Sequence, residues 1–179
     1  IGSETHSTIG VQRQTNYALK AKSREEFIKL VTEGLTDPPK YFFVDAVINR
    51  EGYEPHESIM EKVFHPLSVS QTNDLLMKGD TVIIDTRPAK IFTEGYIPGS
   101  LFIGLEGSFE VTAGSSVDRD ATIVIVSEKG REKEVVIRLT RIGYDNIAGY
   151  LDGGFSEWIQ SGEPIDTITS ISAADFEER

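Results

Sequence analysis

Residues 122–139 combine a strand pattern with a helix pattern. Residues 122–126 form a run of apolar and β-branched side chains, which is typical of a parallel strand covered on both faces. After a loop at 127–132, apolar positions return at helical spacing and predict an amphipathic helix. The loop therefore lies between the carboxyl end of a strand and the positive end of a helix, where α/β proteins place anion sites and nucleophiles.

The chain from residue 67 onward alternates between strand and helix patterns. Short β-branched runs predict the strands, and polar N-caps or glycine stops limit the helices. In chain order we expect a capped helix at 70–79, a short strand at 81–85, a segment at 91–96, a turn at 97–100, a weak strand at 101–104, a polar stretch at 113–120, the strand and helix of 122–139, a short strand at 146–151 and a closing helix at 153–162. This alternation predicts an α/β fold with a mostly parallel central sheet.

The beginning of the chain shows helix patterns without strands between them. Ser23 and Glu26 predict a capping box, and Phe27 begins the apolar stripe of a helix that should end near Gly34. A further helix at 41–49 is apolar on nearly all sides, so we expect it to pack on more than one face. Helices without a sheet indicate the trailing part of a larger domain.

Three features concern the limits of the domains. Residues 54–65 form a polar connector in which one helical turn is expected. The pattern of residues 67–76 returns at 169–178, which predicts that a second copy of the same domain begins there. The chain also starts within a loop and lacks an initiator methionine, so we interpret it as a fragment of a longer protein.

Composition narrows the range of functions. The net charge of −11 disfavours nucleic acids and anionic membranes, because neutralising phosphates needs a surplus of Lys and Arg on one face. The absence of cysteine excludes disulfides and cysteine-based chemistry. His6, His56 and His65 are too widely spaced to suggest a metal site. No membrane span or export signal is visible, so we expect a cytoplasmic location.

Three stretches of the sequence resemble the rhodanese domain, the sulfurtransferase fold, in the order that this family has them. The resemblance is carried by residues 84–88 with 92–101, by the Ser127 loop, and by 142–158 with 162–164. It implies a rhodanese-like three-layer sandwich over residues 66–166, preceded by the helical segment.

The loop at Ser127 departs from the family pattern. In the rhodanese family a cysteine opens this loop as the nucleophile, and the loop N–H groups hold its persulfide. Ser127 stands at the matching position, and a serine hydroxyl neither ionises near neutral pH nor carries sulfane sulfur. The resemblance therefore implies a non-catalytic domain with a vestigial loop, which consists of Ser127, Glu128, Lys129, Gly130, Arg131 and Glu132.

Residues 1–53 resemble the C-terminal tail of a persulfide dioxygenase with the metallo-β-lactamase fold. The resemblance is carried by residues 7–10, 12–13, 16–19, 25–27 and 38–42. It implies a bacterial fusion protein with two rhodanese domains, in which residues 167–179 are the linker and the start of the second. The iron ligands of the dioxygenase family would lie upstream, so we expect no metal or cofactor within this chain.

Two sets of residues are candidates for chemistry other than sulfur transfer. Asp85 and Arg87 follow one strand, and in rhodanese-like folds such a pair more often fixes the next loop through buried hydrogen bonds than it catalyses a reaction. Ser127 as a hydrolytic nucleophile would need a base, and no histidine is suitably placed.

The same loop is also a candidate anion site. The helix terminus favours a small anion, which would be held by Ser127, Lys129, Gly130 and Arg131. Acidic residues alternate with the basic ones in this stretch, so the local charge cancels.

These observations predict a non-catalytic rhodanese-like domain of a sulfur-metabolism fusion protein. Its partners would be the flanking domains of its own chain, which it would position so that sulfane sulfur can pass between them. Two alternatives stay open. One is a sensor module that binds a small sulfur oxyanion or a persulfide without turnover, and the other is a weak hydrolase that uses Ser127.

Overall fold

The structure is a computed structural model that describes residues 6–35, 41–52, 56–169, 171 and 176. The chain divides into two compact units, Ile1–Pro38 and Pro39–Arg179. The domain boundaries predicted from the sequence stay a prediction, and most of the proposed second copy at 169–178 lies outside the described residues.

The first unit consists of short helices, which are α1 (Ile9–Thr15), the 3₁₀ helix η1 (Tyr17–Lys20) and α2 (Arg24–Thr32). The Ser23 hydroxyl accepts a hydrogen bond from the Glu26 N–H at 3.1 Å, as the capping box predicts. The Glu26 carboxylate accepts from the Lys22 N–H at 2.7 Å, whereas a reciprocal box would use the Ser23 N–H. The cap therefore extends one residue further back than predicted.

Apolar side chains of this first unit are exposed. Among its described residues, none in the three helices is buried. Ile9, Tyr17 and Leu35 are exposed by 76%, 60% and 71%. The described part of the unit therefore has no apolar core of its own.

Two helices precede the sheet in the second unit, α3 (Tyr41–Glu51) and α4 (His56–Val63). In α3 the aromatic rings of Phe42 and Phe43 are exposed by 54% and 64%, so the described residues do not give these two side chains the packing that the apolar sequence predicts.

Helix α4 is longer than the single turn predicted for the connector. Its apolar residues Ile59, Met60 and Val63 are spaced so that they share one face. Val63 is 4% exposed, and Ile59 and Met60 pack against the same core cluster. The segment is therefore part of the sandwich, because this face packs against the core next to α8 (Glu132–Arg141).

The core of the second unit is a five-stranded sheet with the order β1-β5-β4-β2-β3. All pairs of these neighbouring strands are parallel. The strands are β1 (Pro66–Leu67), β2 (Thr81–Asp85), β3 (Leu101–Phe102), β4 (Thr122–Val126) and β5 (Ile147–Leu151); the other helices are α5 (Val69–Leu76), α6 (Ala89–Glu94), α7 (Phe109–Ser116) and α9 (Gly154–Gln160). The predicted α/β fold with a parallel central sheet is confirmed.

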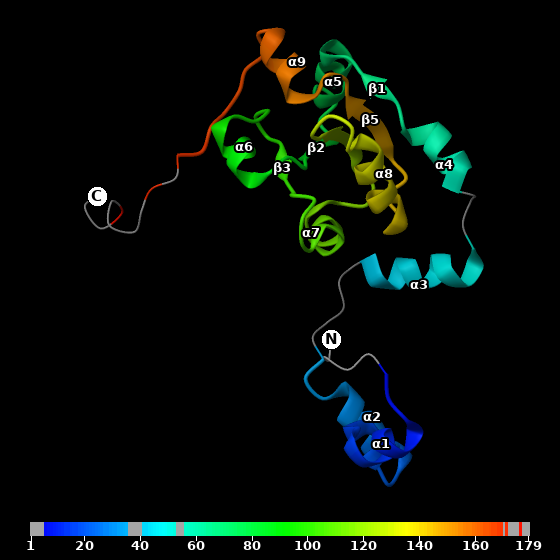
Figure 1. The fold of residues 1–179 in the computed structure, drawn as a ribbon. Coiled ribbons are helices and arrows are strands. Elements are labelled where there is room, and N and C mark those ends of the chain that lie inside the picture. The colour runs from blue at the N-terminus through cyan, green and yellow to red at the C-terminus, as the bar shows by residue number, and fades with distance from the viewer. Residues whose placement is uncertain (1–5, 36–40, 53–55, 170, 172–175, 177–179) are drawn as a thin grey trace. The chain divides into compact units, whose positions relative to one another are not determined.

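Strand β4 is buried on both faces, which explains its uninterrupted apolar run. Ile123 and Ile125 belong to the core cluster shared with α4, α7 and α8. Val124 and Val126 face the opposite cluster, which holds Trp158 and receives side chains from α5 and α9. Figure 1 shows the resulting layers, with α7 and α8 on one face of the sheet and α5 and α9 on the other.

Helix α7 differs from the sequence prediction, which assigned a polar stretch to 113–120. Its sequence FEVTAGSS contains Thr, Gly and Ser, which are weak helix formers. Burial of Phe109 and Ala113, exposed by 1% and 0%, stabilises the helix against the sheet. Tertiary packing therefore overrides the local preference at this position.

Helix α5 begins earlier than predicted. Ser68, and not Ser70, is the N-cap, and it forms a reciprocal capping box with Gln71. The two hydrogen bonds of this box are 3.2 and 2.9 Å long.

Among the helices of the described residues, none combines the length and apolar character that crossing a membrane requires.

Gly149 is the position where strand pairing tolerates no side chain. It has φ +149°, it lies where β5 shifts register against β4, and a Cβ there would overlap the His65 carbonyl oxygen and lie 3.0 Å from Leu67 Cγ. We expect Gly149→Ala to lower the free energy of unfolding by about 2 to 4 kcal/mol, measured by urea unfolding.

Gly99→Ala is the matched control for this prediction. Gly99 also has a positive φ, +79°, but nothing lies within 4 Å of its added Cβ, so its cost is limited to the backbone. An equal loss in both variants would show that close packing at Gly149 is not the cause.

Candidate functional site

The loop after β4 lies at the carboxyl edge of the sheet. It joins β4 to α8, and Gly130 turns it with φ +90°. Ser127 opens the loop and is only 6% exposed. Its hydroxyl donates to the carbonyl oxygen of Glu128 at 3.2 Å, and its own carbonyl oxygen lies close to Gly154 at the start of α9, where a Cβ would come within 3.3 Å.

The loop holds a carboxylate of its own chain. Both carboxylate oxygens of Glu132 accept a hydrogen bond from the Gly130 N–H, at 3.0 and 2.8 Å. The Arg131 N–H donates to the Glu128 carbonyl oxygen at 3.0 Å. An anion that approached the Gly130 N–H would therefore have to displace the Glu132 side chain.

Arg131 carries the positive charge of the loop into a group of acids. Its guanidinium forms ion pairs with Glu134 at 3.0 Å, Glu106 at 3.1 Å and Glu128 at 3.9 Å. The hydrogen bond with Glu134, and next the one with Glu106, raises the pKa of Arg131. The hydrogen bond with Arg131 lowers the pKa of Glu134. Both groups therefore stay charged at neutral pH.

Asp85 and Arg87 form a buried ion pair at the end of β2. Arg87 Nη2 lies 2.6 Å from Asp85 Oδ2, and Arg87 Nε lies 2.9 Å from Asp85 Oδ1. Asp85 also accepts from the backbone N–H of Arg87 at 3.1 Å. The guanidinium donates to the Gly95 carbonyl oxygen at 2.8 Å and stacks 4.0 Å above the ring of Phe155. The pair therefore connects β2 with the end of α6 and with α9.

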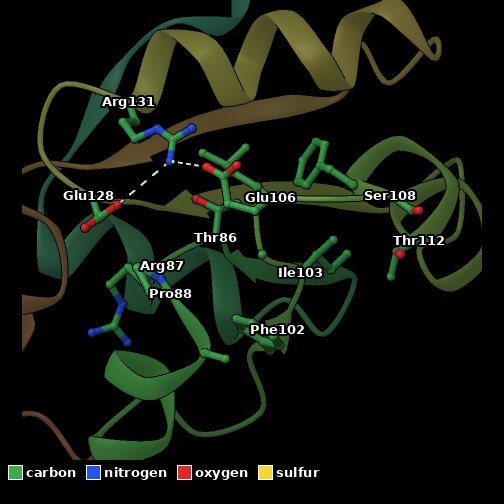
Figure 2. Close-up of a pocket in the computed structure, with 14 residues that line it drawn as sticks. Thr86, Arg87, Pro88, Phe102, Ile103, Glu106, Ser108, Thr112, Glu128 and Arg131 are labelled. Atoms are coloured by element: carbon green, nitrogen blue, oxygen red, sulfur yellow. Dashed lines mark hydrogen bonds and ion pairs between the residues drawn. The ribbon is translucent and has the colours of Figure 1, made fainter.

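A cleft of about 630 Å³ opens beside the loop. Its described lining includes Glu128 and Arg131 from the loop but not Ser127. Figure 2 shows Arg131 lying between Glu128 and Glu106 at the rim of this cleft. The cleft is therefore bordered by the loop, and Ser127 is not part of its lining.

A second ion pair holds one wall of the cleft. Arg138 of α8 binds Glu110 of α7 at 2.7 Å and donates to the Leu105 carbonyl oxygen at 2.6 Å. Its guanidinium also lies 4.9 Å from the ring centre of Phe109. The hydrogen bond with Arg138 lowers the pKa of Glu110. This contact fixes the segment between β3 and α7 relative to α8.

The structure brings some of the predicted site residues together and leaves others apart. Glu128, Gly130, Arg131 and Glu132 contact one another through the bonds described above, whereas the Lys129 side chain is exposed. Sequence reasoning missed the residues that complete the site from elsewhere in the chain, which are Glu106, Glu110 and Arg138. No local pattern identifies them, since Glu106 precedes Arg131 by 25 residues.

Metal ligands do not gather in the described part of the chain. Within residues 6–35, 41–52, 56–169, 171 and 176, no group of three or more His, Asp or Glu side chains is arranged to hold a metal ion. The prediction that this chain holds no metal stays a prediction.

Comparison with known proteins identifies the family. The model of the rhodanese-like domain family matches residues 68–161. A thiosulfate sulfurtransferase, GlpE of Pseudoalteromonas translucida, is 30% identical over 96 residues, which cover 53% of this chain and 89% of that protein. The chain therefore belongs to the rhodanese-like domain family, as the sequence motifs predict.

Solved structures share the fold at lower identity. A metallo-beta-lactamase from Staphylococcus aureus has a TM-score of 0.61 and 24% identity, and the match covers 84% of this chain and 41% of that one. The BH2092 protein from Bacillus halodurans has a TM-score of 0.52 and 13% identity, with 69% and 96% covered. The chain thus spans about two fifths of the length of the S. aureus protein, and these likenesses show the fold alone.

The buried ion pair leads to a stability prediction. Asp85→Asn should lower the free energy of unfolding by about 3 to 5 kcal/mol, because Arg87 would keep its charge in a buried place without its partner. Urea unfolding followed by circular dichroism measures this loss. Glu106→Gln, which removes an exposed partner of Arg131, should change stability little. Equal losses in the two variants would contradict a special role for the buried pair.

Proposed function

We propose that this chain is a non-catalytic rhodanese-like domain of a sulfur-metabolism protein. Its role is to position flanking domains of the persulfide dioxygenase and sulfurtransferase types, so that sulfane sulfur passes between their active sites. The observation that carries the proposal is the side chain at the carboxyl end of β4, which is the hydroxyl of Ser127 in a chain without cysteine.

The chemistry of sulfur transfer explains why the side chain at position 127 determines whether the domain can carry sulfur. A thiolate attacks the sulfane sulfur of thiosulfate, the S–S bond of thiosulfate breaks, sulfite leaves, and a new S–S bond forms in the persulfide. The hydroxyl of Ser127 does not ionise near neutral pH. It is also buried and donates to the Glu128 carbonyl oxygen.

The charges of the loop support the same proposal. The Gly130 N–H, which would face an anionic group in an open loop, already donates to the Glu132 carboxylate. The Arg131 guanidinium is paired with three carboxylates. A sulfur anion would therefore compete with acids of the protein itself.

Exposed apolar surface supports a positioning role. Ile9, Leu35 and Phe43 are each exposed by more than 60%, and contact with neighbouring domains would remove such surface from water. The likeness to the S. aureus metallo-beta-lactamase extends over 84% of this chain, more than the rhodanese-like domain alone. The proposal also includes a fusion of this chain with an iron-binding dioxygenase-like domain. It further includes a cytoplasmic location.

The nucleophile can be tested by restoring it. The natural chain should show no thiosulfate:cyanide sulfurtransferase turnover above buffer. Ser127→Cys should gain one sulfane sulfur on incubation with thiosulfate, detected by mass spectrometry. The double variant Ser127→Cys with Glu132→Gln should gain the sulfur faster. In this variant the charged Glu132 carboxylate no longer competes with thiosulfate for the Gly130 N–H.

Ser127→Ala is the control for this experiment. Turnover by the natural chain that persists in Ser127→Ala would overturn the proposal, since the activity would then come from a group outside the loop. Labelling of Ser127→Cys that Glu132→Gln leaves unchanged would contradict the blocking role of Glu132 and leave the missing thiol as the cause.

A second candidate function is a module that binds a small sulfur oxyanion or a persulfide without turnover. The Gly130 N–H favours it, because this group already binds a carboxylate. Glu132 argues against this function, because its carboxylate must leave the Gly130 N–H before another anion can bind there.

Calorimetry separates the two candidate functions. Titration with thiosulfate, sulfite or glutathione persulfide should give no saturable heat with the natural chain, because Glu132 and the acids around Arg131 repel the ligand. Saturable heat that is lost in Arg131→Gln would favour the binding module. Lys133→Gln, which removes an exposed positive charge from α8, is the matched control.

Nothing in the described residues favours the hydrolase reading. The hydrogen bond of the Ser127 hydroxyl is to a backbone carbonyl oxygen, and no imidazole or carboxylate of the described residues bonds to it. His65 precedes β1, which is separated from β4 by β5, and this places it about 10 Å to the side.

A further inference from the structure

The segment that follows α9 is bound to the end of α6 by backbone hydrogen bonds. We call residues 163–168 the strap; they lie beyond residue 161, where the match to the family model ends. The Tyr96 N–H donates to the Asp166 carbonyl oxygen, and the Asp166 N–H donates to the Tyr96 carbonyl oxygen, both at 2.9 Å. The Ile168 N–H donates to the Thr93 carbonyl oxygen at 2.9 Å. Figure 1 shows this segment running from α9 to α6.

Two side chains hold the beginning of the strap. The Trp158 indole N–H donates to the Pro164 carbonyl oxygen at 2.9 Å, and the Asn73 amide donates to the Glu163 carboxylate at 2.8 Å. Trp158 belongs to α9 and Asn73 to α5. The strap is therefore attached to three helices, although it contains no helix itself.

The strap is exposed, whereas the groups that it covers are buried. All of its residues are described and none of them is buried, and the side chains of Ile165 and Ile168 are exposed by 43% and 48%. Beneath it Gly95 is buried, and Trp158 is 2% exposed. A segment that is held by exposed hydrogen bonds and buries little apolar surface opens without unfolding of the whole domain. We therefore expect the strap to detach more easily than the sheet unfolds.

One peptide group joins the strap to the buried ion pair. The carbonyl oxygen of the Gly95–Tyr96 peptide accepts from Arg87 Nη2 at 2.8 Å, and the N–H of the same peptide donates to the Asp166 carbonyl oxygen at 2.9 Å. Because this peptide is planar and trans, its C=O and N–H point in opposite directions from one rigid unit. Hydrogen bonds in such a chain also polarise one another. Detachment of the strap would therefore free one side of the peptide that holds Arg87.

Arg87 extends this connection to the cleft. Thr86, Arg87 and Pro88 line the cleft, and in Figure 2 the Arg87 guanidinium points away from Arg131 at the rim. Besides Asp85, the Gly95 carbonyl oxygen is the group that orients this guanidinium by a hydrogen bond. A peptide that moves with the strap would therefore loosen Arg87 and the part of the wall that follows β2.

We propose that the strap is a detachable segment that controls the order of this wall of the cleft. While the strap is bound, the Gly95–Tyr96 peptide holds Arg87, and residues 86–89 keep one arrangement. When the strap detaches, the peptide and Arg87 gain freedom and the wall loosens. A flanking domain that binds the strap would in this way change the cleft. This inference goes beyond the proposed function, and it holds whether or not sulfur passes between flanking domains.

Hydrogen exchange of the natural chain, followed by nuclear magnetic resonance at low urea concentrations, tests the detachment. The amides of Tyr96 and Ile168 should exchange at least roughly tenfold faster than those of residues 123–126 in β4. Their rates should depend little on urea, because opening of the strap exposes little surface. Exchange as slow as in β4, with the same dependence on urea, would overturn the inference.

A proline in the strap tests the connection to Arg87. Asp166→Pro removes the N–H that donates to Tyr96, and it should speed exchange of the Tyr96 amide and of the Arg87 Nε–H by roughly three- to tenfold, as the loss of one hydrogen bond predicts. Thr167→Pro is the matched control, because the Thr167 N–H forms no hydrogen bond with the described residues. It should leave both rates nearly unchanged, and the β4 amides should keep their rates in both variants.

Each other outcome contradicts the inference. Faster exchange at Tyr96 without a change at the Arg87 Nε–H would show that the strap does not reach the ion pair. Equal acceleration of the β4 amides, or failure of Asp166→Pro to fold by circular dichroism, would show that the strap does not open separately from the domain. Equal effects of Asp166→Pro and Thr167→Pro would show that the hydrogen bond to Tyr96 is not the cause.

Discussion

The buried ion pair of Asp85 and Arg87 is the interaction on which the carboxyl edge of the sheet depends. Burying two charges is costly, so both are compensated within the protein. Arg87 therefore binds Asp85, the Gly95 carbonyl oxygen and the ring of Phe155 at once. These contacts fix the turn after β2 relative to α6 and α9. Thr86, Arg87 and Pro88, which follow β2 and line the cleft, take their positions from this arrangement.

Above this edge the loop has the form of an anion site and fills it with its own side chains. The strand, the turn at Gly130 and the start of α8 direct an N–H toward a negative group, and that group is the Glu132 carboxylate. In a chain of the rhodanese-like family that has no thiol, this contact bears on function as well as on packing. A loop that needs no anion from outside agrees with the proposal that the domain works through contacts with neighbouring domains.

The acids around Arg131 give the cleft a different character from the loop. A loop N–H binds the Glu132 carboxylate, whereas at the cleft rim the Arg131 guanidinium lies between the carboxylates of Glu106 and Glu128. The two sites lie side by side because Glu128 and Arg131 belong to both.

Most of the parallel strands and their flanking helices could be predicted from the sequence, because β-branched runs such as 81–85 and 122–126 are local signals. Helix α7 could not, since its Thr, Gly and Ser residues disfavour a helix that the burial of Phe109 and Ala113 stabilises. Helix α4 was underestimated for the same reason, because its apolar face becomes evident only against the core.

The sequence by itself determined the family and the chemistry of the first loop position. Motifs of the family are continuous in the chain, and whether a side chain is a hydroxyl or a thiol needs no folding to decide. Only the tertiary structure decided the charge of the site. Glu106 and Glu110 lie 25 and 28 residues from the arginines that they bind, and ion pairs over such separations exist only once the sheet and its helices have brought the partners together.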